Sequence, residues 1–75
     1  MQIYGNLSGN SGVKAYAIRE GAIEVEFANG QAYLYDDAHT GPVRIRRMRC
    51  LARAGRGLST YISREVRDAY ARRLR

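Results

Sequence analysis

The sequence has few of the residues that build covalent or membrane-spanning scaffolds. It contains one cysteine, Cys50, so no internal disulfide framework can form, which fits a reducing compartment. No apolar run approaches the roughly 18 residues of a membrane span. The opening stretch MQIYGNLSGNSG lacks the basic and apolar regions of a secretory signal. We therefore expect a cytoplasmic protein of bacterial or phage-like type, and its 75 residues suffice for one small domain.

Acidic residues are scarce in the second half of the chain. Residues 1–43 carry two basic and five acidic residues, a net charge of −3, whereas residues 44–75 carry eleven arginines and two acidic residues, a net charge of +9. The whole chain has a net charge of +6. This asymmetry predicts a polyanionic or acidic partner for the second half. The alternative is a solvated surface whose charge only maintains solubility.

Residues that carry catalytic or metal chemistry are also few. Cys50 and His39 are the only thiol and imidazole, and neither has a partner at zinc spacing. Asp36 and Asp37 resemble a solvated strand end more than a cation site. Cys50 falls on an apolar side and is expected to be an inert core thiol, while His39 lacks a second acid–base group. GRG and GNSG form no nucleotide fingerprint, so we expect a non-enzyme without metal or cofactor.

Three stretches alternate between apolar and polar residues and predict strands. A turn-forming lead-in over residues 1–12 is expected to be flexible. The predicted strands are residues 13–19, 23–28 and 31–36. Glu20-Gly21 is short enough for a two-residue hairpin loop, because glycine supplies the positive φ. That loop gives the pairs Ile18–Ile23 and Tyr16–Val25, which keep the apolar side chains on one face.

The second turn, within FANGQAYLYDD, leaves two registers open. A two-residue Asn29-Gly30 loop places Val25 opposite Leu34. Tyr33 and Tyr35 would then stand on the outer face as a platform for stacking bases. This register also drives an aspartate of the third strand into the core, where a charge is costly.

The other register turns both rings inward. A three-residue loop over residues 28–30, closed by a glycine bulge, sets Val25 opposite Tyr33 and Ile23 opposite Tyr35. Each buried tyrosine removes roughly 150–250 Å² from water, worth a few kcal/mol for the two at about 25 cal/mol/Å². The buried area favours this register, in which Tyr33 and Tyr35 form a core aromatic motif and the leucine between them is exposed.

The period changes after the turn HTGP, and residues 43–54 predict a helix. Pro42 suits its first turn, and Gly55 suits its left-handed C-cap. The predicted apolar side consists of Val43, Met48, Cys50, Leu51, Ala52 and Ala54. The opposite side carries a row of basic residues, Arg46, Arg49 and Arg53.

A second helix is predicted after the turn GRG. Ser59 or Thr60 can serve as its N-cap, and the helix is expected to continue toward the C-terminus with an Asp68–Arg72 pair on its surface. Its predicted apolar face consists of Ile62, Val66, Ala69, Tyr70 and Leu74, and its outward arginines are Arg64, Arg67 and Arg75. The expected fold is α+β, a three-stranded antiparallel meander followed by two helices packed on one sheet face, over residues 13–75.

The ordered set SGVKAYAI, IEVEFANGQAYLY and the turn before Pro42 resembles the KTSC-type domain. That family is named for the C-terminus of some lysyl-tRNA synthetases and also occurs as small stand-alone bacterial proteins. The resemblance covers roughly residues 11–35 and, more loosely, AGRGLSTYI. Leu34 stands where such domains usually have a polar residue. The resemblance implies a small α+β domain for which RNA binding has been suggested, and it supplies no catalytic residues.

The arginines are the predicted functional residues. Guanidinium groups match phosphates in a two-pronged geometry, and nothing in the sequence specifies a base. We expect a nucleic-acid-binding module, for RNA rather than DNA, whose oligomeric state stays open. The predicted contact residues are Arg46, Arg49, Arg53, Arg56, Arg64 and Arg67. The alternative is a protein-interaction module, such as a phage- or mobile-element-type inhibitor that docks on an acidic partner surface.

Overall fold

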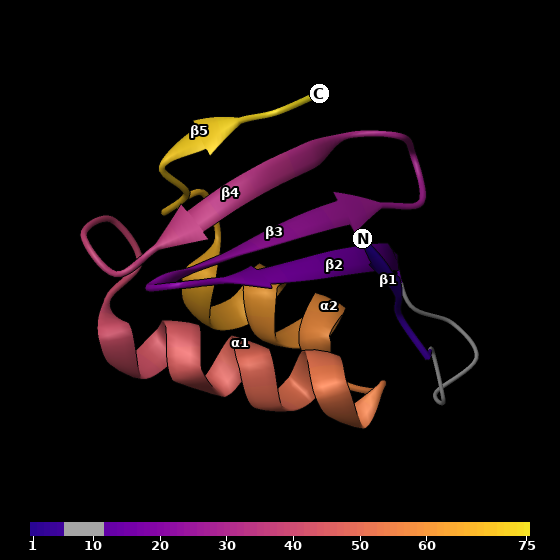
Figure 1. Ribbon diagram of the computed structural model, residues 1–75, viewed down its shortest axis with the longest axis horizontal. Coiled ribbons are helices and arrows are strands. Elements are labelled where there is room, and N and C mark those ends of the chain that lie inside the picture. Colours follow the sequence, from indigo (N-terminus) through magenta and orange to yellow (C-terminus); the bar gives the residue numbers. More distant parts are fainter. Residues whose placement is uncertain (6–11) are drawn as a thin grey trace.

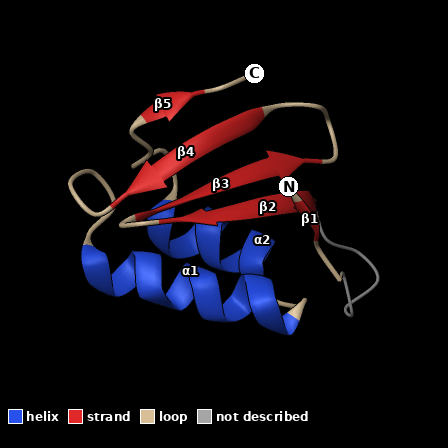
Figure 2. Cartoon of the chain, viewed as in Figure 1, coloured by secondary structure: helices blue, strands red, loops and turns tan. Residues whose placement is uncertain are grey.

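The computed structural model describes residues 1–5 and 12–75. The fold is α+β: five antiparallel strands in the order β1-β2-β3-β4-β5 form one sheet, and the helices cover one of its faces (Figures 1 and 2). The elements are β1 (Gln2–Ile3), β2 (Val13–Arg19), β3 (Ala22–Phe27), β4 (Ala32–Asp36), α1 (Pro42–Ala54), α2 (Leu58–Tyr61), the π-helical turn η1 (Ile62–Val66) and β5 (Arg72–Arg73).

The first hairpin has the predicted register. Ile18 lies opposite Ile23 and Tyr16 opposite Val25 in the β2–β3 ladder. Gly21 takes the positive φ of 65° that the two-residue loop requires. The alternation of the two strands therefore places their large apolar side chains on the helix-covered face.

The second hairpin confirms the inward register of the tyrosines. Ile23 pairs with Tyr35 and Val25 with Tyr33 across β3 and β4. Gly30 has a φ of 90°, and its N–H donates to the Phe27 carbonyl oxygen at 3.0 Å, which closes the three-residue loop. Tyr35 is only 2% exposed and belongs to the core, whereas Tyr33 is half-buried at its edge.

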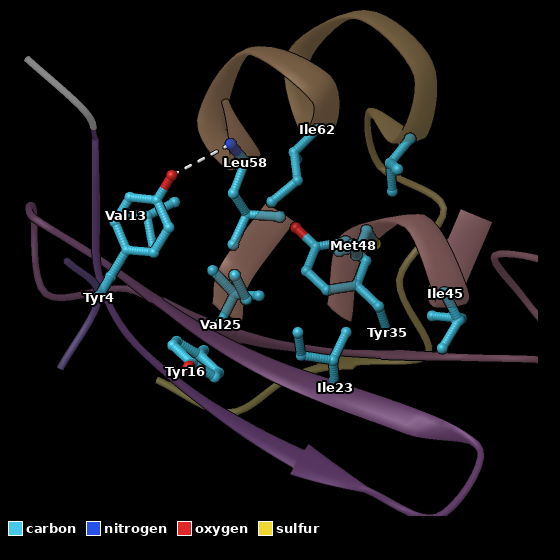
Figure 3. Close-up of a cluster of buried hydrophobic side chains, with 12 residues drawn as sticks. Tyr4, Val13, Tyr16, Ile23, Val25, Tyr35, Ile45, Met48, Leu58 and Ile62 are labelled. Carbon is cyan, nitrogen blue, oxygen red and sulfur yellow. Dashed lines mark hydrogen bonds between the residues drawn. The ribbon is translucent and has the colours of Figure 1, made fainter. Parts of the chain in front are cut away.

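The core lies between the sheet and the two helices, and its side chains come from every layer of the fold. Figure 3 shows the ring of Tyr35 projecting from β4 toward η1, between residues of β3 and α1. The fully buried side chains with the largest volumes are Tyr35, Ile23, Ile45, Met48, Leu58 and Val25. Burying these side chains provides the main favourable term for a domain of this size.

Helix α1 begins and ends as predicted, but the predicted apolar side is only partly correct. Met48 and Ala52 are buried and Leu51 packs against the core, whereas Val43, Cys50 and Ala54 are exposed. Gly55 adopts the left-handed conformation, with φ 75° and ψ 22°, and its N–H bonds to carbonyl oxygens of the last turn. The buried residues are Ile45, Met48 and Ala52. Val43 is 73% exposed and Cys50 is also exposed, so Cys50 is not a core thiol. The buried set has the spacing i, i+3, i+7, which gives a narrower stripe than the sequence indicated.

The second helix is much shorter than predicted. It begins at Leu58, after Gly57 rather than after a side-chain cap, and its π-helical last turn ends at Val66. The chain then turns back and β5 pairs with β4, where Arg72 lies opposite Leu34. Leu34 is therefore half-buried rather than exposed. Pairing satisfies the backbone groups at the free edge of β4, and this outweighs the apolar helical spacing of the sequence.

The N-terminal residues add a fifth strand and a core aromatic ring. Gln2 and Ile3 pair with β2, and Tyr4 is only 3% exposed. The Leu58 N–H donates to the Tyr4 hydroxyl at 3.2 Å, so Tyr4 caps the start of α2 (Figure 3). Of the lead-in predicted over residues 1–12, residues 6–11 lie outside the described residues, and residues 2–4 are part of the sheet and core.

Arg67 has the strained backbone that ends η1. Its φ of 55° and ψ of −121° suit the first central position of a type II′ turn, and the Ala69 N–H bonds to the Val66 carbonyl oxygen at 3.1 Å across that turn. An arginine in this conformation costs on the order of 1–3 kcal/mol.

We expect Arg67→Gly to raise the free energy of unfolding by about 1 kcal/mol, because relief of strain exceeds the added freedom of the unfolded chain. Urea denaturation measures the change. Arg56→Gly removes the same charge from a residue without a positive φ and should not stabilise the fold. A lower stability of Arg67→Gly would show that the turn holds no strain.

Candidate nucleic-acid interface and aromatic cleft

Helix α1 carries five arginines and no acidic residue within its thirteen residues. The row Arg46, Arg49 and Arg53 recurs at i, i+3 and i+7, so these side chains share the side of α1 that faces β2. Arg53 lines a hollow with Ala17 and Ile18 of β2, which places the row along that edge of the helix.

Arg49 is tied into the fold more than its neighbours. It is half-buried, and its guanidinium donates to the carbonyl oxygen of Arg19 at 2.9 Å. The Arg49 Nε is buried without a partner among the described residues. Arg46 and Arg53 are both exposed, so they are the members of the row with the greatest freedom to reach a ligand.

The other predicted arginines occupy two further places. Arg56 is exposed in the turn between the helices. Arg64 lines a hollow on the opposite side of α1 together with Arg47, a residue that the sequence analysis left out. Arg67 lies apart from both groups, at a cleft between η1 and the β3–β4 hairpin. The structure thus divides the six predicted residues among two sides of α1, the interhelical turn and this cleft.

Few of the arginines are neutralised. Among the described residues, the carboxylates of Glu24 and Glu26 pair with Arg19 at 2.6 Å and with Arg75 at 3.6 Å. Both pairs involve the sheet rather than α1. The acidic half of the sequence is therefore partly compensated by Arg19 and Arg75, while the exposed arginines of α1 keep their positive charge toward solvent.

The cleft beside Arg67 has a volume of about 620 Å³ and an aromatic wall. Tyr70, in the segment between η1 and β5, lies 4.6 Å from Tyr33 and 6.2 Å from Tyr35 between ring centroids. Phe27 contacts Tyr33 edge to face at 5.9 Å. Tyr70 reaches this wall only because the chain leaves the helix at Arg67.

The amide side chains of Asn29 and Gln31 line the outer part of the cleft. The Tyr33 hydroxyl donates to Gln31 Oε1 at 3.1 Å, and the Gln31 N–H donates to Asn29 Oδ1 at 3.0 Å. Both amides line the cleft. These bonds orient the Tyr33 ring and leave amide groups at the rim for a ligand.

Tyr35 lies at the inner end of the cleft. Its hydroxyl has no hydrogen-bond partner within residues 1–5 and 12–75, although the residue is only 2% exposed. Burial raises the pKa of Tyr35 above its usual value, with a further contribution from Tyr33 and Tyr70. The group therefore keeps its proton at neutral pH and can donate a hydrogen bond.

His39 and Asp36 form the one imidazole–carboxylate pair in the described structure. His39 Nδ1 lies 2.8 Å from Asp36 Oδ1, which also accepts the His39 N–H. The side-chain hydrogen bond, then the backbone one, lowers the pKa of Asp36. The pair closes the exposed loop before α1, outside the cleft. No group of three metal-ligating side chains occurs among the residues the structure describes.

The sequence did not predict the aromatic cleft, although it predicted the inward position of Tyr33 and Tyr35. Its other wall comes from residues that were predicted to continue the second helix, so Tyr70 could not be placed near Tyr33 and Tyr35.

None of the helices in the described ranges has the length and apolar character needed to span a membrane.

Comparison of the chain with protein-family models, curated proteins and solved structures returned no match. The resemblance to the KTSC-type domain therefore stays a prediction.

Proposed function

We propose that the protein is a non-enzymatic nucleic-acid-binding module, acting on RNA, with the arginines of α1 as its main contact surface. The observation that carries this proposal is the absence of any carboxylate partner for the exposed arginines of α1 in the described structure. Guanidinium groups without a carboxylate partner attract phosphates, and binding releases the counterions of the nucleic acid. The resemblance to the KTSC-type domain supports the same proposal.

The outer face of the sheet gives less support to a protein partner. Glu24 and Glu26 are paired with arginines, and Leu34 is half-buried beside β5. An acidic protein docked on the basic helices is the competing occupant, and the experiment below includes it as an outcome.

The proposal predicts binding that weakens steeply with salt. If about five arginines contact phosphates, log K should fall against log salt with a slope of about −3.5 for single strands and about −4.5 for duplexes. Fluorescence anisotropy with labelled RNA and DNA of mixed sequence measures the slope. Because contacts to phosphates carry no sequence information, the affinity should vary little among sequences.

Polyglutamate is the matched competitor, since it offers negative charge without phosphates. RNA should bind in preference to polyglutamate at equal charge, because guanidinium groups fit phosphates with two parallel hydrogen bonds. Equal binding of both polymers would favour the acidic protein partner. Absence of RNA and DNA binding at low salt would overturn the proposed function.

A further inference from the structure

The aromatic cleft has the size and lining of a ligand site. Its volume of about 620 Å³ falls within the roughly 300–1,000 Å³ of small-molecule pockets. Phe27, Tyr33 and Tyr70 are half-buried, so part of each ring remains open to solvent. Rings held in place by the fold can stack on a planar group without losing much conformational entropy.

The Tyr35 hydroxyl points to a polar edge on that planar group. The hydroxyl is not among the fully buried side-chain atoms that lack a partner in the described residues, so it is open to the cleft and can donate a hydrogen bond to a ligand there. Figure 3 shows the hydroxyl between β4 and the helices. The hydroxyl is thus placed to read the inner edge of a flat group inserted between the sheet and η1.

Charged groups at the rim indicate what the planar group carries. Arg67 and Asp68 both line the cleft and both are exposed. Arg67 can contact a phosphate, while Asp68 accepts hydrogen bonds from amino or hydroxyl groups. The carboxylate also opposes a doubly charged terminal phosphate, so the pair suits a phosphodiester with one negative charge. Arg67 occupies the positive-φ position of the strained turn, where glycine is preferred, and this turn places its backbone at the rim of the cleft.

We propose that the cleft takes one unpaired nucleobase of a single-stranded nucleic acid, stacked on the aromatic wall, with its edge on the Tyr35 hydroxyl and its phosphodiester on Arg67. This inference rests on the proposed function and adds a second contact surface to it. Bases in a duplex cannot enter the cleft, so the protein should prefer single strands beyond the electrostatic attraction of α1.

Three variants of the cleft test this inference. Tyr35→Phe removes only the hydroxyl, Tyr70→Leu removes one stacking ring, and Arg67→Gly removes the guanidinium while suiting the turn. Each leaves the core volume nearly intact, and thermal denaturation confirms folding. Binding to a short single-stranded RNA should weaken about fivefold for Tyr35→Phe and roughly tenfold for Tyr70→Leu. A 2-aminopurine in the strand should be quenched on binding to the wild type and less by Tyr70→Leu.

The controls separate the cleft from the arginine surface. Affinity for a duplex should change by less than about twofold for Tyr35→Phe and Tyr70→Leu, because duplex binding depends on phosphates alone. Tyr61→Phe makes the same chemical change at a half-buried tyrosine outside the cleft and should leave single-strand binding unchanged.

Each outcome decides one point. Equal single-strand affinities for the wild type and the cleft variants, with salt-dependent binding intact, would overturn the inference and leave the proposed function standing. Binding of adenosine monophosphate as tightly as the strand would assign the cleft to a free nucleotide instead. Failure of the wild type to bind either RNA form would overturn the proposed function itself, and with it this inference.

Discussion

Replacing Tyr4 by alanine is expected to lower the free energy of unfolding by about 3–5 kcal/mol. The substitution removes a ring that is 3% exposed and the hydroxyl that accepts the Leu58 N–H. Leu58 is itself fully buried, so its N–H would be left without a partner in a dry environment. A domain of this size has a net stability of roughly 4–11 kcal/mol, so the variant should lose a large share of it. Urea denaturation followed by circular dichroism measures the loss.

Two further substitutions separate the causes. Tyr4→Phe keeps the ring and should cost about 1–3 kcal/mol, the penalty of the unpaired N–H. Ile3→Ala changes the preceding residue, which is 86% exposed, and should stay within about 0.5 kcal/mol of the wild type. If Tyr4→Ala had the same urea midpoint of unfolding as the wild type, residues 1–4 would contribute nothing to stability, as the sequence alone indicates.

Reversing two charges on α1 is expected to have the largest effect on binding. Arg46→Glu/Arg53→Glu replaces two exposed arginines with carboxylates that repel phosphates. The affinity for RNA should fall on the order of 100-fold at about 0.1 M salt, and the salt slope should become shallower by about two. Anisotropy titrations at several salt concentrations measure both quantities. Arg49 is left unchanged because its guanidinium also bonds to β2.

Arg72→Glu/Arg73→Glu is the matched control. It changes the net charge by the same amount, at exposed residues of β5 on the sheet. The control should retain most of the affinity, because a local phosphate contact depends on position and the overall charge acts only through a screened field. Equal losses in the two double variants would show that binding follows net charge and has no preferred surface.

The strand registers could be predicted because they depend on neighbouring residues. Gly21 and Gly30 supply the positive φ of their turns, and the alternation of β3 and β4 then decides which face each side chain takes. Gly55 ends α1 by the same local chemistry. Placing Tyr35 in the core followed from these local rules together with the area it buries.

The buried side of α1 could not be read from its sequence. Val43 and Cys50 are seven residues apart and share one side of the helix, whereas Ile45 lies on the opposite side, so the residues themselves favour no single stripe. Contact with β3 and β4 selected Ile45 and left Val43 and Cys50 to solvent. Arginine stems can also cover apolar surface, and Arg49 is half-buried here, so charge alone does not mark the exposed side of the helix.

The amino-acid sequence by itself determined the two hairpins, the end of α1 and the concentration of positive charge in the second half. Turn chemistry and side-chain alternation act over a few residues, and charge is a property of composition. Only the tertiary structure decided that Tyr4 caps a helix 54 positions later, that the last residues pair with β4, and that Tyr70 joins Tyr33 and Tyr35 in a cleft. These contacts join residues far apart in the chain. The local pattern allows the last residues to form either a helix or a strand, and the free edge of β4 stabilised the strand.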